Sequence, residues 1–464
     1  MTTVVTHLDV GVPERAPSAV DGVRLHLIFT ALIALVLLAL FGLQSTKPPL
    51  PAPSSTPDAQ FSAERAMVRL RHIASKPHPT GSPANAEVRD YLVGELKALG
   101  LDPQVQSALA TSALMSTAGN IHNIVVRVPG RVPGKALMLA AHYDSVPTGY
   151  GAADDGASVA AILETLRALK TSGRLQNDLI VLLTDGEEAG LLGAEAFVAK
   201  HPWARDVGLV LNFEYRGNSG PMLMFETSAG NGKLVEALGS VPRAAGSSLL
   251  YEVYKLLPND TDLSAFRRAG MPAMNFAAME RATSYHTQLD TADNLNQGSM
   301  QQQGDIMLAL ARHFGQADMA DLKAGDRVYF ELPGVGMVTY PAALALPLAL
   351  VCVALLGSVL VLGVRSGALR VVRSIVAGVV VPFVGIVIAI VCSLLWGGIK
   401  AIHPHYRSLL DVYNGHWYWL GFVALAIVLF VLATALLQRW LRALELAAGT
   451  ALLWVGLLLL CTRV

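Results

Sequence analysis

Five long apolar runs constrain this chain more than any other feature, because none of them contains Asp, Glu, Lys or Arg. A helix that spans a bilayer needs about 20 mostly apolar residues. Four of the runs reach roughly that length, and the last is shorter. The runs are 25–43, 340–364, 375–399, 417–437 and 446–461. A buried core helix explains one such run but not four, so we expect a multi-pass integral membrane protein embedded in a lipid bilayer.

The first run is predicted to be a retained transmembrane anchor. The apolar core of a cleaved signal peptide is about 7–15 residues long. The run 25–43 is longer than that, and a largely polar tail, 1–24, precedes it. The Pro- and Ser-rich segment 44–60 follows, and its composition predicts an extended spacer that packs no core.

Arginine placement predicts the orientation in the membrane. The loop between the second and third runs contains Arg365, Arg370 and Arg373. The loop between the fourth and fifth runs contains Arg439 and Arg442. Cytoplasmic loops of membrane proteins are enriched in Lys and Arg. We therefore expect these loops and the N-terminal tail in the cytoplasm, and the large segment between the first two runs on the extracytoplasmic side.

Charge and cysteine content indicate which partners, bonds and cellular compartment to expect. The 35 basic and 35 acidic side chains balance, and without a basic tract we expect no nucleic-acid partner. Cys352, Cys392 and Cys461 all lie in apolar runs, so the extracytoplasmic segment has no disulfide and no thiolate ligand. This absence and the compact membrane region favour a bacterial inner membrane, with the domain facing the periplasm, over an endoplasmic-reticulum or vacuole membrane. The oligomeric state stays open.

Strand-like and helix-like segments alternate between the first two apolar runs. Uniformly apolar strands separated by helices are typical of a mostly parallel, mixed sheet sandwiched by helices. The predicted strands are 123–128, 135–144, 178–185, 207–214 and 221–227, and the predicted helices are 82–100, 158–170, 189–200 and 230–240. We expect an α/β domain over 61–320, a pre-membrane segment over 321–339 and an α-helical transmembrane region over 340–464.

Histidine and carboxylate side chains gather at the ends of three predicted strands. These residues are His142 and Asp144, Glu187 and Glu188, and Glu214. In open α/β sheets the ligand crevice lies beyond the carboxyl ends of the strands. We therefore expect the three strand ends to meet in one acidic, histidine-bearing pocket.

Two further residues complete a candidate metal site. Asp154 lies on the glycine-flanked turn "AADDG", and His286 lies in "SYHTQLD". Each of these short motifs alone is typical of a turn, a polar rim or a helix cap. Together, nitrogen and oxygen ligands without thiolate suit Zn²⁺ in a catalytic site. Two ions about 3.5–4 Å apart need a shared carboxylate, which an aspartate on a rigid turn can provide.

The ordered motif "HYDS…GAADDGASVAAILE…TDGEEAGLLGAEAF…YHTQLDTADNL" resembles the M28 family of co-catalytic zinc peptidases. The resemblance covers about residues 60–315. "FEYRGNSGPMLMFET" and "NDTDLSAFRRAGMP" are similar to its membrane branch of endoplasmic-reticulum metallopeptidases and vacuolar membrane proteases. The resemblance implies a zinc aminopeptidase-like fold, two Zn²⁺ per chain and hydrolysis of peptide substrates by an aminopeptidase-type exopeptidase.

The resemblance also implies a ligand set. His142 and Glu214 would bind one zinc ion, Glu188 and His286 the other, and Asp154 would bridge them. Many soluble members have Asp where Glu214 stands; glutamate is one methylene longer and can bind the ion equally well. In the family, the peptide bond after the bridging aspartate is often cis.

Three further roles follow from the same resemblance. Glu187 would be the general base, Asp144 would orient His142, and Tyr285 would stabilise the oxyanion of the tetrahedral intermediate.

Three alternatives remain at this stage. A glutaminyl cyclase shares the fold but uses one zinc ion for intramolecular cyclisation. A catalytically inactive receptor or scaffold would have lost ligand positions, and none is lost here. A transporter would carry ionisable residues inside its membrane helices, and these runs contain almost none, so we interpret the membrane region as an anchor.

Overall fold

The computed structural model describes residues 19–112, 115–171, 173–257, 259–407, 412 and 414–462. The chain divides into two compact units, Met1–Lys47 and Pro48–Val464. In the first unit, helix α1 (Ala19–Ser45) includes the whole predicted anchor. From Phe29 onward its large apolar side chains are exposed, as expected of a helix that meets lipid.

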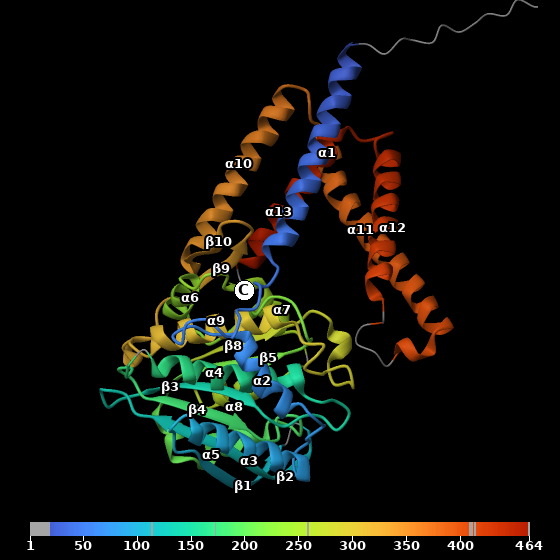
Figure 1. Ribbon diagram of the computed structural model, residues 1–464. Coiled ribbons are helices and arrows are strands. Elements are labelled where there is room, and N and C mark those ends of the chain that lie inside the picture. Colours follow the sequence, from blue (N-terminus) through green and yellow to red (C-terminus); the bar gives the residue numbers. More distant parts are fainter. Residues whose placement is uncertain are drawn as a thin grey trace, which may run out of the picture. The chain divides into compact units, whose positions relative to one another are not determined.

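An eight-stranded mixed sheet forms the centre of the α/β domain (Figure 1). Its strands are β1 (Gln104–Ser112), β2 (Thr117–Val128), β3 (Ala136–His142), β4 (Leu179–Thr184), β5 (Val207–Tyr215), β6 (Leu223–Thr227), β7 (Ala245–Gly246) and β8 (Ala273–Ala278). In space they follow the order β1-β2-β4-β3-β5-β8-β6-β7. The central strands β4, β3, β5 and β8 are parallel. β2 pairs antiparallel with β1 and β4, and β6 pairs antiparallel with β8 but parallel with β7.

The five predicted strands correspond to β2 through β6, which confirms the expected mixed α/β sheet. β3, β4 and β5 are buried along their whole length. This burial explains why their sequences are continuously apolar instead of alternating. Strands β1, β7 and β8 were not predicted from the sequence, and β8 supplies the last strand of the parallel centre.

Helices cover both faces of the sheet. One face packs against α2 (Ala63–Ile73), α3 (Pro83–Ala98), α4 (Ser158–Lys170), α6 (Gly232–Gly239) and α9 (Gln297–Phe314), and the other against α5 (Leu192–Lys200) and α8 (Asp262–Arg268). Side chains alternate along β3, with Leu137 and Leu139 in the first core and Met138 and Ala140 in the second. The expected helix 189–200 begins at Leu192, because a turn at the end of β4 precedes it.

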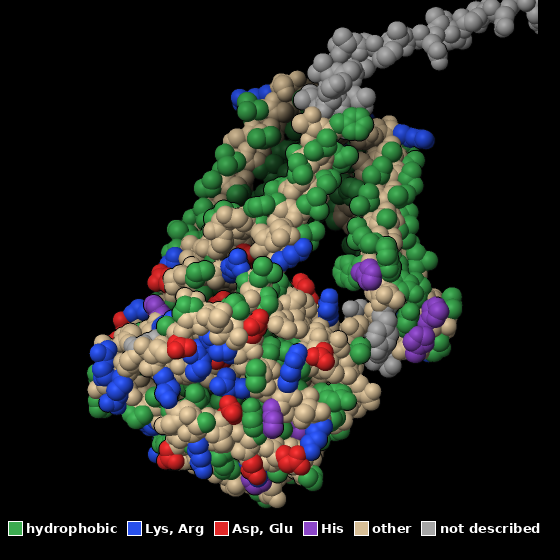
Figure 2. Space-filling view, in the orientation of Figure 1, with side chains coloured by type: hydrophobic (Ala, Val, Ile, Leu, Met, Phe, Trp, Pro, Cys, Tyr) green, Lys and Arg blue, Asp and Glu red, His purple; other side chains and the backbone are tan. Residues whose placement is uncertain are grey.

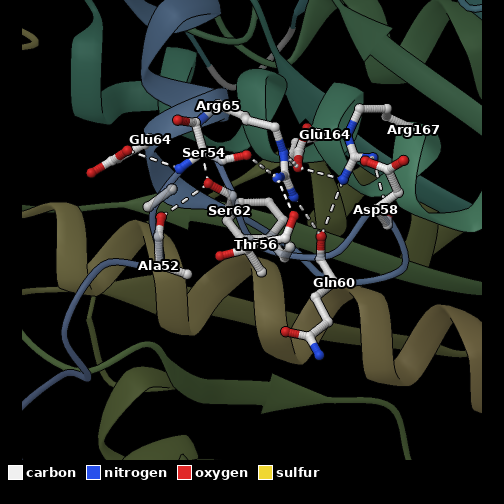
Figure 3. A network of polar contacts seen from close by, with 12 residues as sticks. Ala52, Ser54, Thr56, Asp58, Gln60, Ser62, Glu64, Arg65, Glu164 and Arg167 are labelled. Atoms are coloured by element: carbon white, nitrogen blue, oxygen red, sulfur yellow. Dashed lines mark hydrogen bonds and ion pairs between the residues drawn. The ribbon is translucent and has the colours of Figure 1, made fainter.

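The second half of the predicted spacer lies against the α/β domain, which differs from the extended spacer expected (Figure 3). The Arg65 guanidinium donates to the backbone carbonyls of Ser54, Thr56 and Gln60. Its Nε also donates to the Glu164 carboxylate at 2.7 Å, and Glu164 is fully buried in α4. Proline-rich backbone has few N–H groups of its own, but its carbonyls accept these arginine donors.

The segment expected before the membrane, 321–339, forms most of a hairpin. Its strands are β9 (Arg327–Leu332) and β10 (Gly336–Pro341). The hairpin contacts α6 and α7 (Ser248–Tyr254) and so extends the α/β domain beyond the expected boundary at 320. Tyr340 was expected at the start of a membrane helix, but it lies in β10 because the hairpin pairs it with Val328.

Four helices in the described part of the second unit are long and apolar enough to cross a membrane. They are α10 (Ala345–Arg365), α11 (Val371–Ile402), α12 (Gly415–Leu437) and α13 (Ala443–Cys461). Hydrophobic side chains cover these helices, whereas charged side chains are spread over the α/β domain (Figure 2). The helices extend the expected runs at their ends, so Glu445 lies in the first turn of α13, where it accepts a hydrogen bond from Arg370 at 2.8 Å.

Candidate metal centre

The five predicted ligands meet at the carboxyl end of the sheet. His142 ends β3, Glu214 lies near the end of β5, and Glu188 lies in the turn that follows β4. Asp154 lies in the turn before α4, and His286 in the loop after β8. The parallel centre of the sheet thus brings together residues that are up to 144 positions apart, counting from 142 to 286.

Asp154 lies between the two histidines. Its Oδ1 is 3.2 Å from Nε2 of His142, and its Oδ2 is 3.1 Å from Nε2 of His286. Each histidine has a second carboxylate partner: Glu214 Oε2 lies 3.6 Å from His142 Nε2, and Glu188 Oε2 lies 3.1 Å from His286 Nε2. The arrangement is two histidine–glutamate pairs that share one aspartate.

These distances suit ligand atoms around metal ions. Two atoms bound to one tetrahedral Zn²⁺ with bonds of about 2.0 Å lie about 3.3 Å apart. The four observed separations range from 3.1 to 3.6 Å. Glu188 Oε1 is also buried and has no hydrogen-bond partner among the described residues. Buried polar atoms normally have a partner, so this oxygen too suits a cation. The residues present therefore fit two zinc ions.

Asp155 also lies at the centre, and the sequence analysis did not single it out. Its Oδ2 accepts the backbone N–H of His142 at 3.2 Å, and its Oδ1 is buried without a partner among the described residues. His142, Asp155 and Glu214 offer three ligand atoms within 4.8 Å of one another, as do His142, Asp154 and Glu188. The adjacent pair "DD" was the available signal, but only Asp154 was predicted to lie at the centre.

The turn that carries Asp154 is held from the loop after β8. Asp290, which is 3% exposed, accepts the backbone N–H of Ala153 at 2.6 Å and that of Asp154 at 3.3 Å. The peptide bond between Asp154 and Asp155 is cis, as the resemblance implied. Asp290 lies only four residues after His286, so one loop supplies both a candidate ligand and the contact that holds the bridging aspartate.

Asp144 connects two parts of the centre. Its carboxylate accepts the backbone N–H groups of Glu187 at 3.1 Å and Glu188 at 3.2 Å, and the Thr80 hydroxyl at 3.1 Å. The nearest acceptor for His142 Nδ1 is the backbone carbonyl of Asp144 at 3.0 Å, whereas its carboxylate lies 3.5 Å away. Residue 144 thus orients the histidine mainly through its backbone, and its side chain fixes the glutamate turn.

Glu187 lies beside the ligands and is partly exposed. Its carboxylate hydrogen-bonds to none of the described residues, whereas the neighbouring Glu188 contacts His286. Consecutive side chains in the turn diverge, so one glutamate reaches the ligand cluster and the other remains available for proton transfer.

Arg216 and Tyr285 lie at one side of the centre. Arg216 Nη1 donates to the Tyr285 hydroxyl, and the Tyr285 ring stacks on the His286 imidazole with centroids 3.7 Å apart. A cavity of about 350 Å³ borders Glu214, Arg216 and Tyr285. Its other walls are mostly apolar and include Phe225, Leu250, Val253, Leu257, Ala277 and Met279.

Burial and mutual repulsion shift the pKa values of the acidic groups. Burial raises the pKa of Glu187 well above its usual value, and burial followed by repulsion from Asp154 raises that of Glu188 to about 7. Burial opposes charge on His142, but hydrogen bonds to carboxylates, that of Asp144 first, outweigh it and raise the His142 pKa. Like charges held close together in a buried site destabilise one another, so a bound cation would stabilise this cluster.

Comparison with known proteins agrees with the geometry. Residues 123–311 match the model of peptidase family M28, and this range contains all five predicted ligands. Endoplasmic reticulum metallopeptidase 1 of Homo sapiens is 31% identical over 309 residues, which cover 61% of this chain and 34% of that protein. The vacuolar membrane protease of Candida albicans (strain WO-1) is 32% identical over 289 residues, which cover 61% of this chain and 33% of that protein.

The chain therefore spans about a third of the length of the curated relatives it matches. Among solved structures, an aminopeptidase from Aneurinibacillus sp. strain AM-1 is similar with a TM-score of 0.47 and 13% identity, covering 57% of this chain and 97% of that one. The family match coincides with the strands and loops that carry the histidine–carboxylate cluster. Residues 123–311 therefore match peptidase family M28, and the chain is similar to the membrane-anchored branch of that family.

Proposed function

We propose that this protein is a membrane-anchored di-zinc metallopeptidase that removes residues from the N-terminus of peptides outside the cytoplasm. The observation that carries the proposal is the position of Asp154 between two histidines, with a separate carboxylate oxygen directed at each. Each histidine thus has its own oxygen of one shared carboxylate and a second carboxylate of its own. Two ions that share a carboxylate require such an arrangement.

The ligand assignment follows from the contacts. His142 and Glu214 would hold one ion, Glu188 and His286 the other, and Asp154 would bind both. Zinc bound there supplies Lewis acidity, which lowers the pKa of water to about 7 and polarises a carbonyl. Asp144 and Asp290 keep the ligand-bearing turns in place through backbone hydrogen bonds.

The remaining side chains suit the proton transfers of peptide hydrolysis. Glu187 is placed to take a proton from the attacking water and to deliver it to the leaving amine, as a positioned general acid–base does. Tyr285 donates a hydrogen bond toward the oxygen of the scissile carbonyl, where negative charge develops. Its side chain is positioned for this by stacking on His286.

One feature of the site supports exopeptidase action. The cavity beside Glu214 and Tyr285 is about 350 Å³, large enough for one side chain, and its apolar walls favour an apolar one. The membrane helices act as an anchor in this proposal. The arginines in the loops at Arg370 and Arg442 support an α/β domain outside the cytoplasm, because cytoplasmic loops are enriched in Lys and Arg.

The test uses the full chain purified in detergent. We expect two equivalents of zinc, hydrolysis of aminoacyl-nitroanilides, and loss of both metal and activity in Asp154→Asn. Asp178→Asn is the matched control, because Asp178 is also an aspartate that accepts a backbone N–H, but from Gly130 and away from the centre. One equivalent of zinc together with cyclisation of N-terminal glutamine would identify a glutaminyl cyclase instead. Two zinc ions without hydrolysis of any peptide would overturn the peptidase proposal.

The orientation has a separate test. In right-side-out membrane vesicles, added protease should digest the α/β domain, and in inverted vesicles it should not. The reverse pattern would place the domain in the cytoplasm.

A further inference from the structure

Arg216 brings a positive charge to the edge of an acidic centre. It directly follows β5 and lies two residues after Glu214. Its Nη1 donates to the Tyr285 hydroxyl, and its Nη2 donates to the backbone carbonyl of Asp260 at 3.0 Å. Within the described residues, no carboxylate forms an ion pair with it. By contrast, nearby Arg267 forms an ion pair with Glu226.

The surroundings hold Arg216 in one position. Its backbone N–H donates to the carbonyl of Ala278 at 2.8 Å. At the next residue, Gly217, a Cβ would lie 2.0 Å from the carbonyl oxygen of Glu280. Only glycine therefore permits the backbone segments at Gly217 and Glu280 to approach so closely. The Asp260 carbonyl is fixed as well, because Thr261 beside it caps α8 and accepts a hydrogen bond from Asn275. The guanidinium is therefore a rigid donor.

The donor and acceptor chemistry of the pair determines where the phenol proton goes. A guanidinium only donates hydrogen bonds, whereas a phenol has one proton to donate and lone pairs to accept. Because Arg216 donates to the Tyr285 oxygen, that oxygen is the acceptor and its proton must point elsewhere. Stacking on His286, with the rings inclined by 19°, fixes the plane of the phenol. The direction that remains free for the proton is into the cavity, which Glu214 and Tyr285 both border.

We propose that Arg216 is a positioning residue for Tyr285: it occupies the phenol oxygen as an acceptor and so directs the hydroxyl proton toward the oxygen of the reacting carbonyl. This inference rests on the proposed peptidase function. The guanidinium also lies 5.0 Å from the centre of the Tyr285 ring. From there its charge favours the build-up of negative charge on the carbonyl oxygen, which strengthens the same effect.

Two simpler roles for Arg216 predict different effects of its removal. If Arg216 bound a carboxylate of the substrate, its removal would raise KM and leave kcat nearly unchanged. If Arg216 were only structural, its removal would lower zinc content and thermal stability. A positioning role predicts a loss in kcat that depends on the presence of Tyr285.

The experiment is a double-mutant cycle on the full chain in detergent, with Arg216→Met, Tyr285→Phe and the double variant. Arg216→Met and Tyr285→Phe should each lower kcat by about 10- to 100-fold with little change in KM. In the Tyr285→Phe background, Arg216→Met should cost less than about threefold, because residues that act as a unit are non-additive. Arg216→Lys keeps the charge but cannot reach both Tyr285 and Asp260, so it should restore only part of kcat. Arg268→Met, which removes an exposed arginine paired with Glu195, is the matched control.

Three measurements make the outcome decisive. Zinc content and circular dichroism of all variants should equal those of the wild type. Ultraviolet resonance Raman difference spectra, assigned with Tyr285→Phe, should show that the Tyr285 oxygen accepts a hydrogen bond in the wild type and not in Arg216→Met.

Multiplicative losses in the double variant, a change confined to KM, or a Raman signal that Arg216→Met leaves unaltered would each overturn the proposal. If the wild type hydrolyses no peptide while the Raman signal behaves as expected, the peptidase function fails although the Arg216–Tyr285 contact stands, and the two failures are thus distinguished.

Discussion

The backbone N–H of Glu187 donates a hydrogen bond to the Asp144 carboxylate at 3.1 Å. The next N–H, that of Glu188, donates to the other oxygen of the same carboxylate at 3.2 Å. Asp144 thereby links the end of β3, where His142 lies, to the turn that carries the proposed base and one proposed ligand. A single buried side chain thus sets the relative positions of two halves of the centre.

Asp144→Asn should weaken zinc binding by about 10- to 100-fold, the usual effect of removing a group that orients metal ligands. An asparagine can accept one of the two backbone N–H groups, but its NH₂ then faces the other. Competition with a chelator measures the affinity. Asp178→Asn, remote from the centre, should bind zinc as the wild type does. Equal affinities in both variants would contradict the role of Asp144.

The adjacent glutamates should give opposite results. Glu187→Gln should keep its zinc and lower kcat by about 10²–10⁴-fold, because a general base contributes about that much. Glu188→Gln should lose zinc, because it removes a carboxylate that contacts His286 at 3.1 Å. Metal analysis and single-substrate kinetics on the two variants separate the roles. Zinc loss in Glu187→Gln, or full turnover, would show that the base has been assigned incorrectly.

Asn212 should hold Glu214 in position through a hydrogen bond, as Asp144 holds the turn that carries Glu187 and Glu188. Its Nδ2 donates to Glu214 Oε1 at 3.1 Å and to Asn275 Oδ1 at 3.0 Å, in a fully buried site. Asn212→Ala should therefore lower zinc affinity by about 10-fold or more. Asn120→Ala, on an exposed position of β2, is the control. An unchanged affinity in Asn212→Ala would show that Glu214 needs no such support.

Residues at strand ends could be predicted from the sequence, the loop residues Asp154 and His286 only with the help of the family resemblance, and some residues placed by tertiary contacts not at all. His142 and Glu214 follow apolar strands, so the rule that ligands bind at carboxyl ends located them. Arg216 was missed because its contact with Tyr285 joins positions 69 residues apart, and neither residue alone signals it. Asp155 was missed because local sequence cannot decide which aspartate of a pair faces inward. The hairpin β9–β10 was missed because its strands are only partly buried and because α7, one of the two helices that it contacts, was itself not predicted.

Glu164 should contribute strongly to the stability of the α/β domain. It is fully buried and accepts hydrogen bonds from Arg65 and Arg167 (Figure 3). It also accepts one from Arg69, so its removal leaves three guanidinium groups without their shared partner. Breaking a buried ion pair costs about 3–5 kcal/mol. Glu164→Gln should therefore lower Tm by about 6 °C or more, measured by circular dichroism.

The control for this variant is Asp58→Asn in the same network. Asp58 is 83% exposed and contacts Arg167 at 3.5 Å. An exposed pair contributes less than about 1 kcal/mol, so Tm should change little. Similar shifts in the two variants would indicate that burial of Glu164 does not determine its effect.

Replacing either of two glycines of helix α13 by alanine should change thermal stability in detergent, but in opposite directions. A Cβ on Gly449 of α13 would lie 2.4 Å from the backbone nitrogen of Gly378 in α11, whereas a Cβ on Gly456 would meet no atom within 4 Å. Alanine favours a helix interior by about 1 kcal/mol over glycine, so Gly456→Ala should leave thermal stability in detergent unchanged or raised. Gly449→Ala should lower it, because small residues at a membrane interface let two helix backbones approach closely. If Gly449→Ala matched Gly456→Ala, the close packing of α11 against α13 would be refuted.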